Sequence, residues 1–375
     1  MTKCSPSRRT LHWVCEAPSA YNDFLFQNLA LSPEFDLKVH YRSAFNVHYR
    51  CQLKSDPGYS ARQYDSRVFD NVLFRSVLRD RESLFLTSCW QDPTCELILG
   101  ALLITGRPYL IWNDAPIPRR RPWLKNTLRS VLLSVLFRNA TNVMGTGNLA
   151  LGILNKMGAP RQKLLNFAYC VDLMRFAPST RPPSDERLVL GTCARLEPIK
   201  GIGVALRALA KRTIGPFLYR IAGTGTQEKS LRELVRHLGL ADSVEFCGWI
   251  QPADLPRFYH GLDLYLHPAL FEPYGVAVVE ALASGIPILA SDQTGAALDL
   301  IANGCGLLHR AGDSTDLLRS LEVFLPLLAC DRDRIKEFAR KAACTWTVEN
   351  AVETMEHIVK TLKPRRPEAA IAQVT

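Results

Sequence analysis

The chain has 375 residues and a net charge of +10, and 47% of its residues are hydrophobic and 22% charged. This length predicts two domains, and the composition is typical of a folded soluble protein rather than a disordered one. No apolar run approaches the roughly 18 residues that a membrane-spanning helix needs, which argues against an integral membrane protein.

Cysteine and histidine are not arranged for a metal site or a disulfide framework. The eleven cysteines are scattered, and no Cys-x-x-Cys pair occurs. Residues 11–15 form a short apolar run that we interpret as a first strand rather than as a secretion signal. These features predict a cytoplasmic protein with reduced thiols.

Strand and helix signals alternate through both halves of the chain. In the first half they predict, in order, strand 11–15, helix 21–31, strand 37–40 and strands near 83–86, 109–112 and 142–144. In the second half they predict strand 188–193, helix 204–211, strand 217–222, helix 228–238, strand 244–246, helix 253–260, strand 264–266, helix 276–284 and strand 287–290. Strands separated by helices of this length indicate βαβ units, so the predicted fold class is α/β with parallel sheets.

A proline-rich segment predicts where the two domains meet. Residues 173–186 contain three prolines among serine and threonine, a composition that is typical of linkers. We therefore predict an N-terminal domain over residues 1–172 and a C-terminal domain over residues 187–345. A further helix is predicted over 346–362, and the Pro- and charge-rich tail 363–375 is expected to be disordered.

The positive charge is concentrated in the first half. Residues 1–172 hold 22 Lys and Arg against 13 Asp and Glu, and residues 115–171 hold nine basic residues and no acidic one. Within them, segment 118–138 combines basic residues and Trp123 with apolar residues at helical spacing. The simplest interpretation is a helix that packs inward, and the alternative is peripheral contact with anionic lipid headgroups. No nucleic-acid-binding motif accompanies the charge, so no nucleic acid partner is predicted.

The loops that follow the second-half strands carry the candidate site. Right-handed crossovers bring the carboxyl ends of parallel strands to one edge of the sheet, where open α/β sheets bind their ligands. The loops at that edge are residues 194–201, 223–226, 248–250, 268–275 and 291–295.

Two of these loops carry groups that suit a nucleoside diphosphate. Arg195 offers a planar fork for phosphate oxygens, and Lys200 offers a point charge at the start of the next helix. Gly275 and the free N–H groups of Val276 and Ala277 open a later helix, and a helix N-terminus attracts anions.

Two carboxylates flank that helix start. Glu272 precedes it, and Glu280 lies eight residues further on. Sugar and ribose hydroxyls need hydrogen-bond acceptors, so we expect one carboxylate to face a hexose and the other a ribose. Singly, each feature also has an ordinary explanation: the two cations as surface charges, Glu280 as a solvated helix position, and Gly223-Thr224-Gly225 as a plain strand-to-helix turn.

Five elements of the sequence form an ordered pattern. They are the linker Val171-Asp172 with Phe176, Arg195-x4-Lys200-Gly201, Ile221-Ala222-Gly223-Thr224-Gly225, Val244-Glu245-Phe246-Cys247-Gly248, and Glu272-x7-Glu280 with Gly275 after the first Glu. In this order and spacing, the stretch from Gly191 to Leu308 resembles the C-terminal domain of the retaining GT-B family that is often called glycosyltransferases group 1.

The resemblance implies a GT-B fold, with two Rossmann-like domains facing across a cleft and the last helix returning to the N-terminal domain. It also implies a hexosyltransferase that retains the anomeric configuration and takes a nucleotide sugar as co-substrate, with UDP favoured over GDP. No metal and no other cofactor are expected, because side-chain cations do the work of a divalent ion.

The resemblance also implies roles for individual residues. Arg195 and Lys200 would stabilise the leaving diphosphate, Glu272 would bind the donor sugar, Glu280 the ribose, and the base would lie near Ile250. The other donor-binding residues implied are Gly223, Gly225, Tyr274, Gly275, Val276 and Ala277.

The N-terminal half departs from the family pattern at two loops. The loop after the first strand, residues 16–23, has no glycine, although Ser19 is small enough to admit the donor. Where many relatives have a histidine after a middle strand, this chain has Asn113 and Asp114. We predict that Asp114 or Asn113 contacts the donor or the acceptor hydroxyl, with helix capping or a turn as the alternative.

The acceptor is expected to be a saccharide or lipid-linked hydroxyl in the assembly of a surface glycan or glycolipid. Transfer to a small natural product is the alternative acceptor reaction. Two other activities remain open at this point, namely a nucleotide-sugar epimerase and an inactive nucleotide-sugar-binding subunit.

Overall fold

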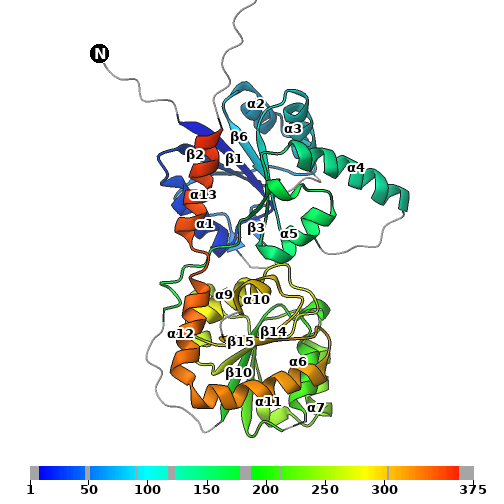
Figure 1. Ribbon diagram of the computed structural model, residues 1–375, viewed down its shortest axis with the longest axis vertical. Helices are drawn as coiled ribbons and strands as arrows, with labels where there is room; N and C mark the ends of the chain where they lie inside the picture. The colour runs from blue at the N-terminus through cyan, green and yellow to red at the C-terminus, as the bar shows by residue number, and fades with distance from the viewer. Residues whose placement is uncertain are drawn as a thin grey trace, which may run out of the picture. The chain divides into compact units, whose positions relative to one another are not determined.

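The computed structural model describes residues 8–46, 51–88, 92–116, 123–177, 187–211, 213–301 and 304–362. They fall into two compact units (Figure 1). The first unit lies within Met1–Trp112, Ser134–Val143 and Val348–Thr375, and the second within Asn113–Leu133 and Met144–Thr347. The contacts thus group residues 144–172 with the second unit. Most of the predicted linker and the whole predicted tail lie outside the described residues, so those limits stay predictions.

A seven-stranded sheet forms the N-terminal part of the fold, with the strand order β5-β2-β1-β6-β7-β8-β9. Its strands are β1 (Arg9–Cys15), β2 (Phe35–Tyr41), β5 (Ser60–Gln63), β6 (Leu84–Thr87), β7 (Tyr109–Asn113), β8 (Asn142–Gly145) and β9 (Leu164–Asn166). The pairs β1–β2, β1–β6, β2–β5 and β6–β7 are parallel. A short antiparallel pair, β3 (Phe45–Asn46) with β4 (Cys51–Gln52), lies outside this sheet.

The helices of this part begin at side chains that cap them. They are α1 (Ala20–Ala30), α2 (Asn71–Arg79), α3 (Pro93–Ile104), α4 (Trp123–Asn139) and α5 (Gly147–Lys156). Ser19, Asp70 and Asp92 accept hydrogen bonds from first-turn N–H groups of α1, α2 and α3, which satisfies donors that a helix start leaves unpaired.

The second unit is built on a six-stranded parallel sheet with the order β12-β11-β10-β13-β14-β15. Its strands are β10 (Leu188–Cys193), β11 (Phe217–Ala222), β12 (Val244–Gly248), β13 (Leu264–His267), β14 (Ile288–Ser291) and β15 (Gly306–His309). Its helices are α6 (Ile202–Leu209), α7 (Glu228–His237), α8 (Leu255–His260), α9 (Val276–Ala283), α10 (Gly295–Leu300), α11 (Ser314–Cys330) and α12 (Arg332–Ala343). This is the doubly wound order of a dinucleotide-binding sheet, in which the order of the strands reverses between β10 and β13.

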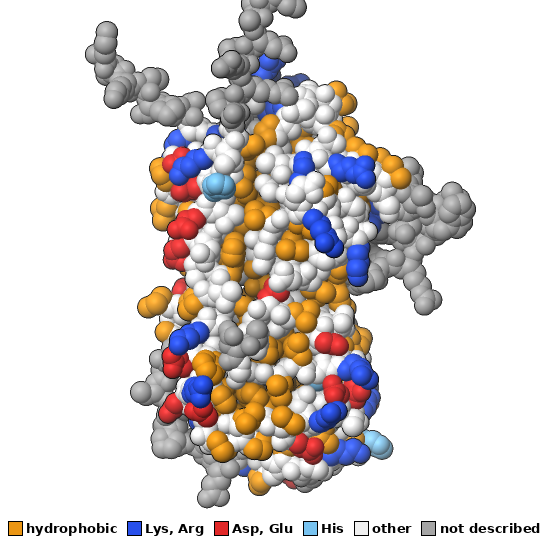
Figure 2. All heavy atoms as spheres, in the orientation of Figure 1, with side chains coloured by type: hydrophobic (Ala, Val, Ile, Leu, Met, Phe, Trp, Pro, Cys, Tyr) orange, Lys and Arg blue, Asp and Glu red, His pale blue; other side chains and the backbone are white. Residues whose placement is uncertain are grey.

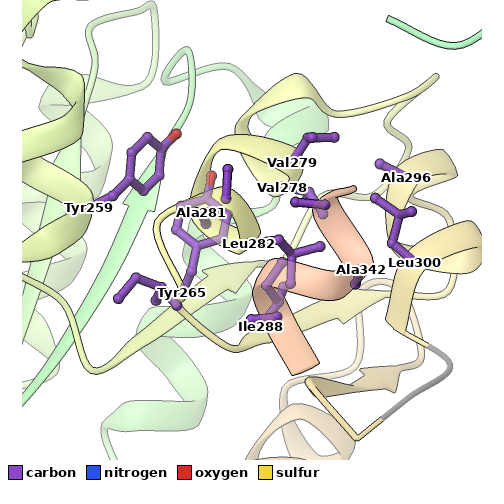
Figure 3. Packing of buried hydrophobic residues seen from close by; sticks show 14 of the residues in the cluster. Tyr259, Tyr265, Val278, Val279, Ala281, Leu282, Ile288, Ala296, Leu300 and Ala342 are labelled. Atoms are coloured by element: carbon purple, nitrogen blue, oxygen red, sulfur yellow. The ribbon is translucent and has the colours of Figure 1, made fainter. Parts of the chain in front are cut away.

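Each face of this sheet has its own hydrophobic core, because successive strand side chains point to opposite sides. Residues of α8, α9, α10 and α12 gather on one face with Tyr265, and residues of α6, α7 and α11 gather on the other with Leu264 and Leu266. Figure 3 shows the first of these cores, in which side chains of α9 lie between Tyr265, Ile288 and the helices α10 and α12. The predicted α/β class is therefore confirmed.

The last helix, α13 (Val348–Thr361), belongs to the first unit, although it follows the second unit in sequence. Glu356 accepts a hydrogen bond from Ser32 at 2.7 Å, and Lys360 lies 3.3 Å from Glu34. The predicted return of the C-terminal helix to the N-terminal domain is confirmed. Trp346, at the predicted start of this helix, instead precedes it and donates to the carbonyl of Ala168.

Candidate active site

The loops after β10 and β13 meet at the point where the strand order reverses. The N–H of Leu270 donates to the carbonyl of Ile199 at 2.8 Å. Gly201 has a left-handed φ of 64°, and a Cβ there would lie 2.0 Å from the carbonyl oxygen of Pro268. Because glycine has no side chain, the two backbones can approach this closely. The close approach brings Lys200 to the β13 loop.

Lys200 and Glu272 form a largely buried ion pair at this junction. Lys200 Nζ lies 2.5 Å from Glu272 Oε2, and their side chains are 12% and 14% exposed. His267 Nε2 lies 3.3 Å from the same oxygen. Burial by itself would raise the pKa of Glu272, but the His267 contact and the Lys200 charge lower it to about 2. Glu272 is therefore an ionised acceptor at neutral pH.

The second carboxylate of the motif has a different environment. Glu280 lies on α9, among apolar residues, and accepts a hydrogen bond from the Tyr259 hydroxyl at 2.8 Å. Burial raises the pKa of Glu280 to about 7, against the opposing effects of the Tyr259 hydrogen bond and the Arg175 charge. The ordinary explanation of Glu280 as a fully solvated helix position is therefore wrong, because Glu280 is half-buried and its carboxylate is held by Tyr259.

The Gly223-Thr224-Gly225 turn supports the loop that carries Arg195. A Cβ on Gly223 would lie 1.9 Å from the Ala194 carbonyl oxygen, and one on Gly225 would lie 2.5 Å from that of Leu196. The N–H of Leu196 donates to Thr224 at 2.9 Å. These glycines let two loops pack backbone to backbone, and Arg195 is exposed beside them.

The start of α9 supplies backbone donors near Glu272. Gly275 precedes the helix with a φ of 98°. The first N–H groups of an α-helix, here those of Val276 and Ala277, have no hydrogen-bond partner inside the helix. Tyr274 is buried, and its ring lies 5.9 Å from that of Tyr169. Ile250, at the end of the loop after β12, packs at the margin of the α9-side core. The predicted donor-binding residues of the second unit thus lie along one edge of its sheet.

Asp114 lies within electrostatic range of Glu272. The Thr146 hydroxyl donates to Asp114 at 3.0 Å. Burial raises the pKa of Asp114, hydrogen bonds from Tyr169 and Thr146 lower it, and the Glu272 charge raises it again. Asp114 receives hydroxyl donors rather than capping a helix N–H, so its predicted contact with substrate stays open.

Ser19 has a structural task in the first unit. Its buried hydroxyl accepts a hydrogen bond from the N–H of Asn22 at 3.2 Å and caps α1. Its predicted contact with the donor stays a prediction. Of segment 118–138, the residues before Trp123 lie outside the described part of the chain.

The sequence analysis missed four residues of this site. His267 ends β13 and directly precedes the predicted site loop 268–275, so a histidine at a strand end was the available signal. Tyr259, Tyr169 and Thr146 reach the carboxylates from other elements, and only the packing shows this. Within the described ranges, no group of three or more His, Cys, Asp or Glu side chains is placed to hold a metal ion.

Comparison with known proteins finds a family match in the second half of the chain. Residues 176–342 match the family model described as glycosyl transferases group 1. This region of the chain is similar to that family. WcaL of Escherichia coli K12, a colanic acid biosynthesis glycosyltransferase by its name, is 31% identical over 215 residues, which are 55% of this chain and 52% of that protein. A D-inositol 3-phosphate glycosyltransferase of Nocardia farcinica is 29% identical over 216 residues, 53% of this chain and 47% of the relative. The chain thus spans about half the length of these curated relatives.

Solved structures extend the likeness in fold to nearly the whole chain. HepE of Anabaena in complex with UDP has a TM-score of 0.75 at 19% identity, over 94% of this chain and 100% of that one. WaaG, a glycosyltransferase involved in lipopolysaccharide biosynthesis, has a TM-score of 0.67 at 15% identity, over 94% and 100%. The fold is therefore the GT-B fold, with two Rossmann-like parallel sheets.

Proposed function

We propose that this chain is a retaining hexosyltransferase that moves a hexose from a nucleotide sugar to a hydroxyl group. The observation that carries the proposal is the pairing of Lys200 with Glu272 where the strand order reverses. A cation suited to phosphate and an ionised acceptor suited to sugar hydroxyls lie side by side there. A donor that joins a diphosphate to a hexose needs both.

Arg195 and Lys200 neutralise the charge that develops on the leaving diphosphate, together with the first-turn N–H groups of α9. These groups supply the positive charge that a divalent ion would otherwise supply, so the reaction needs no metal. The acceptor oxygen bonds to the anomeric carbon on the face from which the diphosphate leaves, as the bond from that carbon to the phosphate oxygen breaks. A donor phosphate oxygen takes the acceptor proton, and the anomeric configuration is retained.

Glu272 binds hydroxyls of the hexose rather than attacking it. Its carboxylate is paired with Lys200 and contacted by His267, and its pKa of about 2 makes it a weak base and a weak nucleophile. Glu280 receives the ribose hydroxyls, and the base lies near Ile250.

The donor we propose is a UDP-hexose, and the acceptor is a growing saccharide of a surface glycan or glycolipid. In support, HepE of Anabaena has been solved with UDP and with UDP-glucose. Curated relatives are named for the biosynthesis of colanic acid, amylovoran and the lipopolysaccharide core. A small-molecule acceptor is the alternative.

Calorimetry with UDP, GDP and their hexose conjugates tests this proposal. We expect the nucleotides of one base, uridine or guanosine, to bind. With the matching nucleotide sugar, the protein should slowly release the free nucleoside diphosphate, at the same rate with and without EDTA. NMR of the glycosylated product then reports its anomeric configuration. A chain that binds none of these nucleotides is not a sugar transferase, and an inverted product would contradict the retaining mechanism.

Asp114 is proposed to contact the acceptor hydroxyl or the donor. We expect Asp114→Ala to lower kcat by about 10²-fold, as loss of a positioned acid–base group does, in a protein with unchanged thermal stability. Thr146→Val is the matched control, because it removes one hydrogen bond to Asp114 and leaves the carboxylate in place. Wild-type kcat and KM in folded Asp114→Ala would restrict Asp114 to a structural role.

Nucleotide binding is expected to strengthen as the pH rises through 7. Glu280 has a pKa of about 7, and only its ionised form is a full acceptor for two ribose hydroxyls. Between pH 6 and pH 8 the ionised fraction rises from roughly a tenth to nine-tenths, so the Kd for UDP should fall by up to about tenfold. The phosphate of UDP also ionises near pH 6. In Glu280→Gln, the pH dependence of Kd that remains comes from UDP and not from residue 280. An identical pH profile in Glu280→Gln would remove Glu280 from ribose binding.

We also propose a cytoplasmic protein with peripheral membrane contact through α4. This helix buries Leu133 and Phe137, but Val131, Leu132 and Val135 are 57%, 57% and 41% exposed. Over α4 and α5, Figure 2 shows Lys and Arg side chains among apolar ones, whereas acidic side chains of the first unit lie mainly over α1 and α13. No described helix combines the length and apolar character that crossing a membrane requires.

Vesicle cosedimentation tests this contact. We expect binding to phosphatidylglycerol vesicles and weaker binding after Leu132→Ser, since a basic, apolar helix face binds anionic interfaces. Equal binding to neutral and anionic vesicles would contradict it.

A further inference from the structure

His267 joins the two strands that flank the point where the strand order reverses. It is the last residue of β13 and is buried on the α9 side of the sheet, like Tyr265. Its Nδ1 lies 3.4 Å from the Tyr265 hydroxyl, whose single proton can be donated either to Nδ1 or to the carbonyl of Cys193 at 3.1 Å. Its Nε2 faces Glu272 Oε2 at 3.3 Å. One imidazole thus links the backbone at the end of β10 to the carboxylate that follows β13.

The contact with Glu272 requires a proton on Nε2. An ionised carboxylate offers only acceptors, so an unprotonated Nε2 at this distance would be repelled. The proton-bearing Nε2 is buried, and no described atom lies in line with its N–H. The contact with Oε2 is therefore a charge contact that a small rotation of the carboxylate would convert into an aligned hydrogen bond.

Lys200 and His267 approach the same carboxylate oxygen. Both lie against Oε2, and among the described residues no donor contacts Oε1. The carboxylate is thus held on one side and open on the other. If Lys200 turns toward a diphosphate, His267 is the remaining group that keeps the buried charge of Glu272 compensated.

We propose that His267 is a positioning residue that holds Glu272 Oε2, so that Oε1 is presented to a hydroxyl of the donor sugar. This inference rests on the proposed function of Glu272. Lysine is a flexible point charge, whereas an imidazole fixed by Tyr265 sets both the direction and the place of the carboxylate. His267 should therefore affect recognition of the hexose and leave recognition of the diphosphate unchanged.

Three variants of the full chain test this inference by calorimetry. His267→Gln keeps an N–H donor near the position of Nε2, His267→Leu removes every donor at similar volume, and His267→Asn keeps a polar group that stops short of Glu272. The probes are UDP and UDP-glucose, or GDP and GDP-mannose if the wild type binds guanosine nucleotides. The readout is the ratio of the two Kd values, which isolates the contribution of the hexose.

We expect His267→Leu and His267→Asn to weaken nucleotide-sugar binding by about 10- to 100-fold, as loss of a bond to a charged group does, with Kd for the free diphosphate within about twofold of wild type. His267→Gln should recover most of the loss. An equal loss for diphosphate and nucleotide sugar indicates a merely structural role and overturns the inference. So does an unchanged ratio in both Leu and Asn variants, or a wild type that gains no affinity from the hexose. A wild type that binds neither diphosphate instead overturns the proposed function itself.

Discussion

Lys200→Met is expected to lower kcat/KM by about 10²–10³-fold, because it removes a preorganised charge from the leaving diphosphate. Among the described residues, the same change leaves His267 as the side chain that contacts the largely buried Glu272 carboxylate. Breaking one side of a buried ion pair is costly, and we expect a loss of up to about 3 kcal/mol in the free energy of unfolding. Steady-state kinetics and denaturant unfolding measure the two effects separately.

The double variant Lys200→Met with Glu272→Gln separates catalysis from stability. It removes both charges of the pair, so the unfolding free energy should return toward the wild-type value while activity stays low. A Lys200→Met protein with kcat/KM within a few-fold of wild type would show that the diphosphate is stabilised elsewhere. Recovery of activity in the double variant would mean that Lys200 matters only through its partner.

The contact between Lys200 and Glu272 follows from features that the sequence carries. The alternation of strands and helices predicts parallel sheets, and right-handed crossovers bring the loops after β10 and β13 to one edge. The predicted bounds 188–193 and 217–222 are correct, because both are mainly apolar segments that end at a loop. The alternation of strands and helices does not predict that Lys200 and Glu272 form an ion pair.

Two of the strands that the sequence did not predict, β5 and β9, are short and lack an apolar pattern. β5 has the sequence Ser-Ala-Arg-Gln and pairs at the sheet edge, and β9 has three half-buried residues. Their strand conformation comes from pairing with a neighbour, which local propensity does not report.

The environments of the two glutamates were likewise beyond the sequence. Spacing places Glu272 and Glu280 eight residues apart, but burial raises the pKa of both carboxyls, and His267 and Lys200 lower that of Glu272 from two other elements. A single polar residue in the apolar helix Val276–Ala283 is the sequence signal that Glu280 is not fully solvated.

Gly201→Ala should disrupt the site far more than Gly239→Ala, a control substitution with the same backbone strain. Gly201 has a φ of 64° and Gly239 one of 66°, so alanine at either position costs about 1–2 kcal/mol in backbone conformation. A Cβ on Gly201 would lie 2.0 Å from the Pro268 carbonyl oxygen, whereas nothing lies within 4 Å of one on Gly239. Only Gly201→Ala must therefore push apart the loops that pair Lys200 with Glu272.

We expect kcat/KM to fall at least about tenfold further in Gly201→Ala than in Gly239→Ala, because small displacements of catalytic groups are costly. Thermal unfolding of both variants shows how much of the difference is stability, and UDP calorimetry shows how much is binding. If the two variants have the same activity and the same Tm, the loops can separate without losing the ion pair. The close approach of the backbones would then not be what places Lys200 beside Glu272.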